Sequence, residues 1–240
     1  MTQARLLALA WCCFAASAFN FGALFGGAPK AAPKVLTNVE IREKYGVQLP
    51  SYDVLAETPA YECRRYQRMS VVECEYTARP EGYELLGGYC SRGENALGLP
   101  MPATSPALMQ PFDSPKRMRF VLPHPHTPLD ASNAPMPPPE PLLEELSAYV
   151  LEPLCVAVAK FSGYATPDVC DTERTKLAAA LKAAGIGLAP RAKEQMFLAQ
   201  YNEMFALPWN RDNEVWLELA EGAFPTADAF PTADAPPTAP

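Results

Sequence analysis

The side chains best suited to chemistry in this 240-residue sequence are one cysteine and two histidines. Cys90 could act as a thiolate ligand or nucleophile if a neighbouring cation such as Arg92 lowered its pKa. His124 and His126 form an H-x-H pair that could bind a metal, although two histidines in a proline-rich loop are more often solvated. The sequence has no G-x-S-x-G, H-E-x-x-H, P-loop or G-x-G-x-x-G motif. These features predict a protein that is not an enzyme and has no metal site.

The stretch from Gly82 to Asn95, GYELLGGYCSRGEN, carries apolar residues at helical spacing around two central glycines, Gly87 and Gly88. Glycine is unfavourable inside a helix, so its presence indicates that something comes close to the backbone there. Tyr83 and Gly87 are four residues apart and share a helix face. Two interpretations stay open: the helix packs tightly against a sheet, or the glycines leave room for a ligand.

The sequence divides into two halves with the same order of elements, and each half contains one helix. Each half begins with β-like runs, continues with a helix and ends with two further strands. The proline-rich stretch 122–141 separates the halves. Two βαββ-type units of this kind predict an α+β protein whose helices pack against one antiparallel sheet or barrel. The expected strands lie within 52–78, 107–110, 116–123, 154–163, 195–201 and 213–219.

The second helix, 166–185, has clear end signals. Thr166 is a typical N-cap, Pro167 suits the first helical position and Gly185 is a typical terminator. The apolar spacing predicts one buried stripe, made of Cys170, Leu177, Leu181 and Ala184.

The two ends of the chain differ in composition from its centre. Arg5 precedes the apolar run LLALAWCCFAASA, so residues 1–18 are interpreted as a signal peptide. Residues 19–46 have no acidic residue before Glu40 and are interpreted as a transit-peptide-like segment or linker. This bipartite leader resembles those of algae with secondary plastids and predicts a plastid protein, with secretion as the alternative. Residues 222–240 repeat a proline- and alanine-rich unit and are expected to be a tail.

Charge and cysteine usage narrow the partners further. The net charge is −7 and no basic cluster exceeds a pair, which excludes nucleic acid as an expected partner. No transmembrane segment is expected in the mature chain. Five cysteines remain after the leader, without a C-x-x-C motif, and are expected to be mostly buried apolar residues: Cys63, Cys74, Cys90, Cys155 and Cys170.

Several segments, taken in order, resemble the SOUL haem-binding family. The closing pattern, from Tyr201-Asn202 to Trp216, is long and specific, and the folded domain is expected over 47–221. The resemblance implies a distorted barrel of eight antiparallel strands flanked by two helices, with a pseudo-twofold βαββ repeat. It also implies haem or another tetrapyrrole, held non-covalently in an open hydrophobic groove beside the first helix. The segments are YDVLAETPAYECRRY, GYELLGGYCSRGEN, ATSP, AVAKFSGYAT and AQYNEMFALPWNRDNEVWLEL.

The groove implied by this resemblance has to suit a porphyrin. A porphyrin is a flat apolar plate with carboxylates on one edge, so its site needs small residues, apolar walls and a cation at the rim. The candidate residues are Tyr83, Leu86, Gly87, Gly88 and Cys90 on the helix, with Arg64 and Arg65 as nearby cations.

Departures from the family pattern change the expected chemistry. Arg65 stands where one branch has an iron-ligating histidine, and Pro80 and Gly88 stand where another branch has cations. We therefore expect tetrapyrrole binding without an axial histidine, in a carrier or buffer of a plastid. The alternative is a non-catalytic structural or interaction protein that keeps the fold, has lost the pigment, and docks on plastid membranes or a photosynthetic complex. Glu214, directly before Val215 and Trp216, is interpreted as structural.

Overall fold

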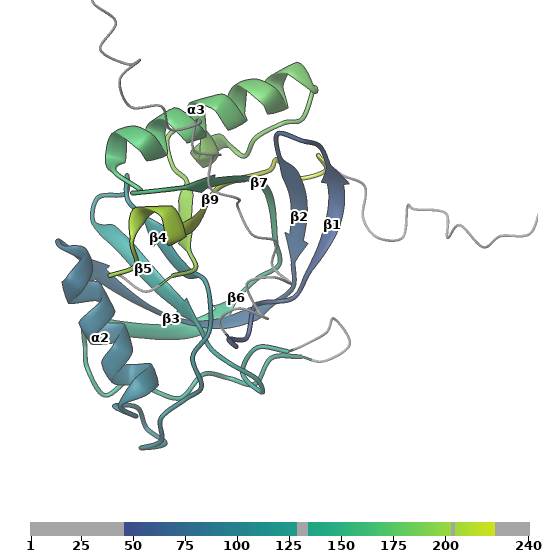
Figure 1. Cartoon of the computed structure of the whole chain (residues 1–240). Coiled ribbons are helices and arrows are strands. Elements are labelled where there is room, and N and C mark those ends of the chain that lie inside the picture. The colour runs from purple at the N-terminus through teal and green to yellow at the C-terminus, as the bar shows by residue number, and fades with distance from the viewer. Residues whose placement is uncertain (1–45, 129–133, 203–204, 224–240) are drawn as a thin grey trace, which may run out of the picture. The chain divides into compact units, whose positions relative to one another are not determined.

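The computed structural model describes residues 46–128, 134–202 and 205–223, and Figure 1 shows their arrangement. They form a curled antiparallel sheet of nine strands with two α-helices against it, so the predicted α+β class is confirmed. The expected signal peptide and nearly all of the expected transit-like segment and repeat tail lie outside the described residues. The elements are β1 (Tyr52–Glu57), β2 (Glu62–Tyr66), β3 (Met69–Tyr76), α2 (Arg79–Ser91), β4 (Ala107–Gln110), β5 (Lys116–Val121), β6 (Leu146–Leu151), β7 (Leu154–Ser162), α3 (Pro167–Ala183), β8 (Phe197–Gln200) and β9 (Asp212–Glu218).

The sheet differs from the expected closed barrel of eight strands. Its strand order is β1-β2-β7-β9-β8-β4-β5-β3-β6, so β1 and β6 are the two ends of a half-barrel (Figure 1). The additional strand is β1, which pairs with β2 in the register Tyr52↔Tyr66. Without β1 the order is β2-β7-β9-β8-β4-β5-β3-β6. If β2, β3, β4 and β5 exchange places with β6, β7, β8 and β9, the result is the same order read backwards. A repeat of two strands, a helix and two strands would produce this symmetry. The repeat itself stays a prediction.

One strand was not predicted from the sequence. β6 begins five residues after Pro141, the last residue of the proline-rich stretch, and its mostly half-buried residues show no clear alternation. It forms because its backbone pairs with β3 along six residues, from Met69↔Leu151 to Cys74↔Leu146. The register of this edge strand therefore comes from its partner rather than from its own apolar pattern.

The first helix, α2, is fixed at its start and packed on one side. The Glu81 carboxylate accepts hydrogen bonds from the backbone N–H groups of Thr77 (3.0 Å) and Ala78 (3.4 Å), and Pro80 occupies the first turn. The helix lies against β3 and β5. A Cβ added at Gly82 would lie 3.1 Å from Met118 Cε, so this glycine allows the close approach to the sheet.

The second helix, α3, lies against β7 and β9 and has the predicted ends. Thr166 Oγ1 accepts a hydrogen bond from the Val169 N–H at 3.3 Å, and Gly185 has a φ of +71°, which suits a terminating glycine. Cys170, Leu177 and Leu181 are buried as predicted. The prediction for Ala184 was wrong, because this residue is the C-cap and is exposed.

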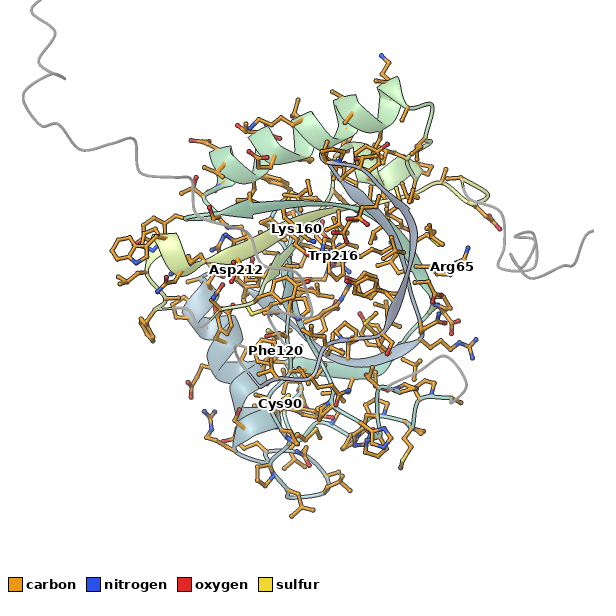
Figure 2. The ribbon with its side chains drawn as sticks, turned by 45° about the vertical axis from the view of Figure 1, so that its right-hand side comes forward. Arg65, Cys90, Phe120, Lys160, Asp212 and Trp216 are labelled. Atoms are coloured by element: carbon orange, nitrogen blue, oxygen red, sulfur yellow. The ribbon has the colours of Figure 1, made fainter. Side chains whose placement is uncertain are left out.

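Two apolar cores lie on opposite faces of the sheet. The first is between the sheet and the helices and includes Leu86, Tyr89 and Leu177. The second fills the concave face and includes Tyr66 and Trp216, whose rings stack with centroids 4.6 Å apart. Figure 2 shows Trp216 in the interior of the curl. Since side chains occupy the concave face, room for a ligand has to be sought outside it. Within the described residues no helix is long and apolar enough to cross a membrane.

Candidate functional site

A cavity of about 240 Å³ lies beside α2 and is called the α2 pocket below. The Tyr83 ring packs on Phe120, with ring centroids 5.7 Å apart, and gives the pocket an apolar wall. Burial raises the pKa of Tyr83, while the nearby charges of Arg79 and Arg211 act in the opposite direction. The lining residues are Val47, Tyr83, Ala103, Thr104, Ser105, Ala107, Phe120, Gln200, Tyr201 and Asn202.

The two central glycines of α2 have different surroundings. Gly87 lies one turn beyond Tyr83 on the same face, and a Cβ added there would meet nothing within 4 Å. A Cβ added at Gly88 would lie 2.2 Å from Glu94 Oε2 and 2.7 Å from Arg92 Nη2. Gly88 therefore gives room to the chain's own side chains, and only the Gly87 face of this pair is open to a ligand.

The other predicted helix residues are less accessible. Leu86 is fully buried in the core between helix and sheet, so it has no surface to offer a ligand in this structure. Cys90 is half-buried, and burial raises the pKa of its thiol to about 12. Arg92 does not activate it, because its guanidinium bonds Glu84 (3.0 Å) and Glu94 (2.8 Å). At neutral pH Cys90 is a thiol, which does not favour a thiolate ligand or nucleophile.

The two predicted cations, Arg64 and Arg65, point to opposite faces of β2, as neighbours in a strand must. Arg64 is fully buried on the concave face. Arg65 is half-buried and lines a separate cavity of about 620 Å³ together with Cys155 and Glu218; Figure 2 shows it at the periphery. Neither residue lines the α2 pocket. Of the predicted residues, Tyr83 lines this pocket, and Gly87 lies one turn further along the same helix face.

Arg64 is the centre of a buried polar cluster on the concave face. Its Nη1 and Nη2 donate to the two carboxylate oxygens of Glu214 at 3.0 Å each, and Nη1 also donates to Tyr66 Oη at 3.0 Å. Glu214 accepts two further hydrogen bonds, from Tyr201 Oη and Trp216 Nε1, each at 2.7 Å. Burial opposes the charged form of Arg64, but the charge and hydrogen bond of Glu214, together with Tyr66 and Tyr201, outweigh it and raise the pKa of the guanidinium.

The rest of this inner cluster completes the charge balance. Arg64 Nε donates to Glu62 at 2.8 Å, and Lys160 also bonds Glu62. Burial alone would raise the pKa of Glu62, but Lys160 and Arg64 outweigh it and lower the pKa. Glu214 is thus enclosed, neutralised and supplied with donors. This arrangement supports the structural interpretation of Glu214.

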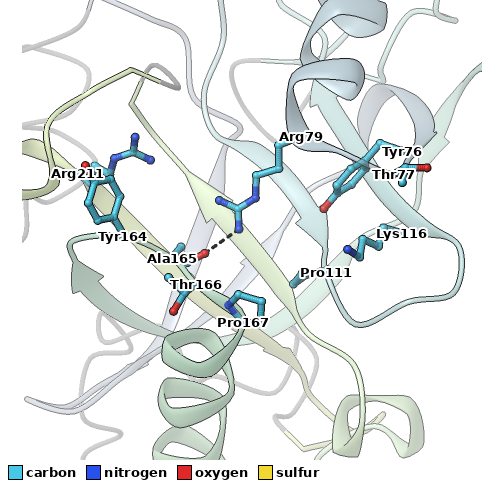
Figure 3. A pocket seen from close by; sticks show the side chains of 10 residues that line it. All are labelled: Tyr76, Thr77, Arg79, Pro111, Lys116, Tyr164, Ala165, Thr166, Pro167 and Arg211. Atoms are coloured by element: carbon cyan, nitrogen blue, oxygen red, sulfur yellow. Dashed lines mark hydrogen bonds between the residues drawn. The ribbon is translucent and has the colours of Figure 1, made fainter.

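A second cavity, of about 370 Å³, lies between the N-terminal ends of α2 and α3 and is shown in Figure 3. We call it the cationic pocket, because Arg79, Lys116 and Arg211 line it without an acidic side chain among its described lining residues. Arg79 Nη2 donates to the Ala165 carbonyl at 2.7 Å, and Nη1 donates to Gln200 Oε1 at 3.5 Å. Gln200 also lines the α2 pocket, so the two cavities are neighbours.

Sequence reasoning did not identify this pocket, although Arg79 is the first residue of the glycine-containing helix α2. Lys116 begins β5 and Arg211 directly precedes β9, far away along the chain. The other lining residues are Tyr76, Thr77, Pro111, Tyr164, Ala165, Thr166 and Pro167.

Apolar side chains protrude from the connection between β8 and β9. Phe205 is 86% exposed, Leu207 51% and Trp209 58%. We call these three residues the apolar loop. The Arg211 guanidinium joins this loop to the cationic pocket, because its Nε donates to the Ala206 carbonyl at 2.8 Å and its charge lies over the Tyr164 ring, 5.0 Å from the centroid.

The two histidines lie away from both pockets. His126 is buried with Nδ1 3.0 Å from the Pro137 carbonyl oxygen, whereas His124 is exposed. In the part of the chain that the structure describes, no group of three or more His, Cys, Asp or Glu residues could hold a metal ion. The described cysteines are free, with Cys63, Cys74 and Cys170 buried as predicted.

Comparison with known proteins gives a family but no close relative. A search of curated proteins finds no match. Among solved structures, a hydrolase from Listeria innocua has a TM-score of 0.45 at 12% identity and covers 78% of this chain and 100% of its own. The C-terminal domain of EcmrR has a TM-score of 0.41 at 10% identity, covering 70% of this chain and 98% of its own. These likenesses are too distant to inform function. The family model for the SOUL heme-binding protein matches residues 47–218, which is most of the chain, and this protein therefore belongs to the SOUL heme-binding family.

Proposed function

We propose that this protein binds haem or another tetrapyrrole non-covalently in the α2 pocket and along the adjoining Gly87 face. Membership of the SOUL heme-binding family supports the ligand class. The observation that carries the location is the open face at Gly87, where an added Cβ would meet nothing within 4 Å. The other exposed positions of α2 include Glu81 and Glu84, whose side chains are charged, whereas the Gly87 position leaves the helix backbone open to a flat ring.

The chemistry of the α2 pocket fits a porphyrin. Tyr83, Phe120 and Ala107 supply apolar contacts for the ring. Arg79, which bonds Gln200 at the pocket edge, places a cation where a carboxylate of the ligand would lie. A pocket of about 240 Å³ encloses only part of such a ligand, so the rest would lie on the open helix face.

Binding here would not use an axial histidine. The sequence has two histidines, and neither lines the α2 pocket. The chain's residues would hold the ring through its faces and its carboxylates, and the iron of haem would add little to the affinity. We therefore extend the proposal to metal-free porphyrins and to a role as carrier or buffer in a plastid, as the composition of the leader suggests.

The test is a Soret-band titration of the full chain with haemin and with protoporphyrin IX. We expect saturable binding of both, with dissociation constants in the micromolar range or below and within about threefold of each other. Gly87→Trp should weaken binding of both ligands at least tenfold, about 1.4 kcal/mol, because the indole covers the open face. Gly87→Ala is the matched control, since a methyl group has room there.

Two results would contradict the proposal. The first is the absence of saturable binding of either pigment. The second is equal binding by Gly87→Trp and Gly87→Ala with unchanged thermal unfolding, which would place the ligand elsewhere.

A second candidate, an interaction protein without pigment, is favoured by one observation. Leu97, Leu99, Leu142 and Leu143 are all exposed on two loops that are joined by the hydrogen bond from Ala96 N–H to the Glu140 carbonyl, at 2.9 Å. Ordered loops that display apolar side chains are typical of protein contact sites. A negative titration with both pigments would favour this candidate, and serine substitutions at Leu99 and Leu142 would then be the first test.

A further inference from the structure

We infer that the apolar loop and the cationic pocket together form a docking surface for an anionic lipid bilayer. This surface shares Arg79 with the proposed tetrapyrrole site, but its other residues do not line the α2 pocket, and the inference does not depend on tetrapyrrole binding. It rests on three features of neighbouring residues: exposed apolar side chains, a cluster of cations, and a contact that holds the two together.

The apolar loop presents large exposed side chains beside a hydrogen-bonded turn. Phe205, Leu207 and Trp209 are each more than half exposed, at 86%, 51% and 58%. The turn that carries them is held by hydrogen bonds from Asn210 N–H to the Leu207 carbonyl (2.9 Å) and from Asn202 Nδ2 to the Asn210 carbonyl (2.7 Å). Tryptophan and phenylalanine are favoured at the boundary between lipid headgroups and acyl chains.

The cationic pocket supplies charge of the sign that lipid phosphates need. The whole chain has a net charge of −7, which on its own would repel an anionic membrane. Most basic side chains of the described residues pair with carboxylates, as Arg68 does with Glu152 and Lys176 with Glu173. Arg79 differs, because its two hydrogen bonds go to a backbone carbonyl and an amide. Lys116 lines the same pocket, so this region carries positive charge on an acidic protein.

Arg211 places the two features side by side. It is two residues from Trp209, and its guanidinium lies over the Tyr164 ring that lines the pocket, as Figure 3 shows. Tyr164 is itself 56% exposed and has a polar end suited to the headgroup level. An orientation that inserts the apolar loop would therefore bring the cationic pocket to the lipid phosphates. A protein partner with an acidic surface is the competing occupant. Such a partner would pair with the cations, but it has no acyl chains to receive the three protruding apolar side chains.

The experiment is co-sedimentation of the full chain with vesicles of phosphatidylcholine alone, and of phosphatidylcholine mixed with an equal part of phosphatidylglycerol. The variants are Phe205→Ser with Trp209→Ser, and Lys116→Gln. The matched controls are Val54→Ser, an exposed apolar residue on β1, and Lys176→Gln, an exposed cation on α3. Residues 1–45 are identical in all of these proteins, so differences between them report on the surface.

We expect binding to the anionic vesicles to exceed binding to phosphatidylcholine alone, and to fall with added salt. Lys116→Gln should weaken it about fivefold, the effect of one basic side chain at such a membrane. The double serine variant should weaken it at least tenfold on the basis of the apolar area removed. Both control variants should bind the anionic vesicles within about twofold of the unchanged protein. Loss of a basic side chain that contacts the membrane would produce a larger change.

The inference is overturned if the double serine variant and Lys116→Gln bind the anionic vesicles as the controls do, or if the unchanged protein prefers neither vesicle. Porphyrin titration of the same variants separates the two proposals. None of the three substituted residues lines the α2 pocket, so pigment binding should persist where lipid binding is lost. Loss of both, with normal thermal unfolding, would contradict the division into two surfaces.

Discussion

Replacement of Arg64 by methionine should destabilise the fold strongly. The Arg64 side chain is fully buried and donates to both oxygens of Glu214 at 3.0 Å. Methionine fills much of the volume but leaves Glu214, which is 2% exposed, without a positive partner, because its other donors, Tyr201 and Trp216, are neutral. An uncompensated buried charge of this kind costs about 3–5 kcal/mol. For a domain of this size, the melting temperature should fall by roughly 6–20 °C.

The assay is urea unfolding of the full chain, with Glu214→Gln and the double variant as comparisons. Glu214→Gln alone should cost less, because Arg64 keeps the Glu62 carboxylate at 2.8 Å. The double variant should be more stable than Arg64→Met, since it removes the stranded charge.

Two outcomes would refute the reasoning about this cluster. One is an Arg64→Met variant within about 1 kcal/mol of the unchanged protein, the range of an exposed ion pair. The other is a deficit that the additional Glu214→Gln substitution does not reduce, which would point to lost packing instead of a stranded charge.

Three further predictions concern other parts of the fold. Gly87→Ala should raise the free energy of unfolding by about 0.5–1 kcal/mol, because the helix has room there. Gly93→Ala should lower it by more than about 1 kcal/mol, because Gly93 has a φ of +73° and an added Cβ would lie 2.8 Å from the Leu99 carbonyl carbon. Urea unfolding of the two variants measures both changes. Iodoacetamide at pH 7.5 should label Cys90 far more slowly in the native chain than in urea, because burial raises its pKa to about 12; equal labelling by peptide mass spectrometry would contradict this. Burial would raise the pKa of Glu62, but Lys160 and Arg64 lower it below its ordinary value of 4.5. The contribution of the Glu62 carboxylate to stability is therefore complete above about pH 4.5 and is lost progressively below it. Lys160→Gln should move the acid-unfolding midpoint to higher pH.

Much of the fold could be predicted because local patterns and tertiary structure agree. The alternation in β3 places Val72, Cys74 and Tyr76 inside, and the cap at Thr166 starts α3 where it is observed. β6 could not be predicted in this way, since its residues at the sheet edge are half-buried and its register comes from β3. The ninth strand, β1, pairs with β2 as a hairpin, and the alternation within 52–78 did not by itself give the number of strands in this stretch.

The candidate site was less predictable than the fold. Family resemblance and helical spacing together point to Tyr83 and Gly87, which do share an accessible face. The same reasoning grouped Arg64 with Arg65, although the period of a strand already sends neighbours to opposite faces. Lys116 and Arg211 meet Arg79 only because β5 and β9 begin at the same side of the sheet as α2. Spacing in the sequence carries no information about such a meeting.

The distribution of charge on the two faces of the sheet explains why a ligand should bind outside the curl. On the concave face Arg64 bonds both Glu62 and Glu214, so its positive charge is already matched by carboxylates of the chain. A porphyrin carboxylate placed there would have to displace one of these pairs and leave a buried charge without its partner, which costs several kcal/mol. Outside the curl, Arg79 donates hydrogen bonds to neutral acceptors. It can therefore pair with a ligand carboxylate without breaking an existing ion pair. If Arg79→Gln weakened the binding of protoporphyrin IX while Arg64→Met left it unchanged at a temperature where both variants are folded, the site would lie on the helix side; the reverse result would place it inside the curl.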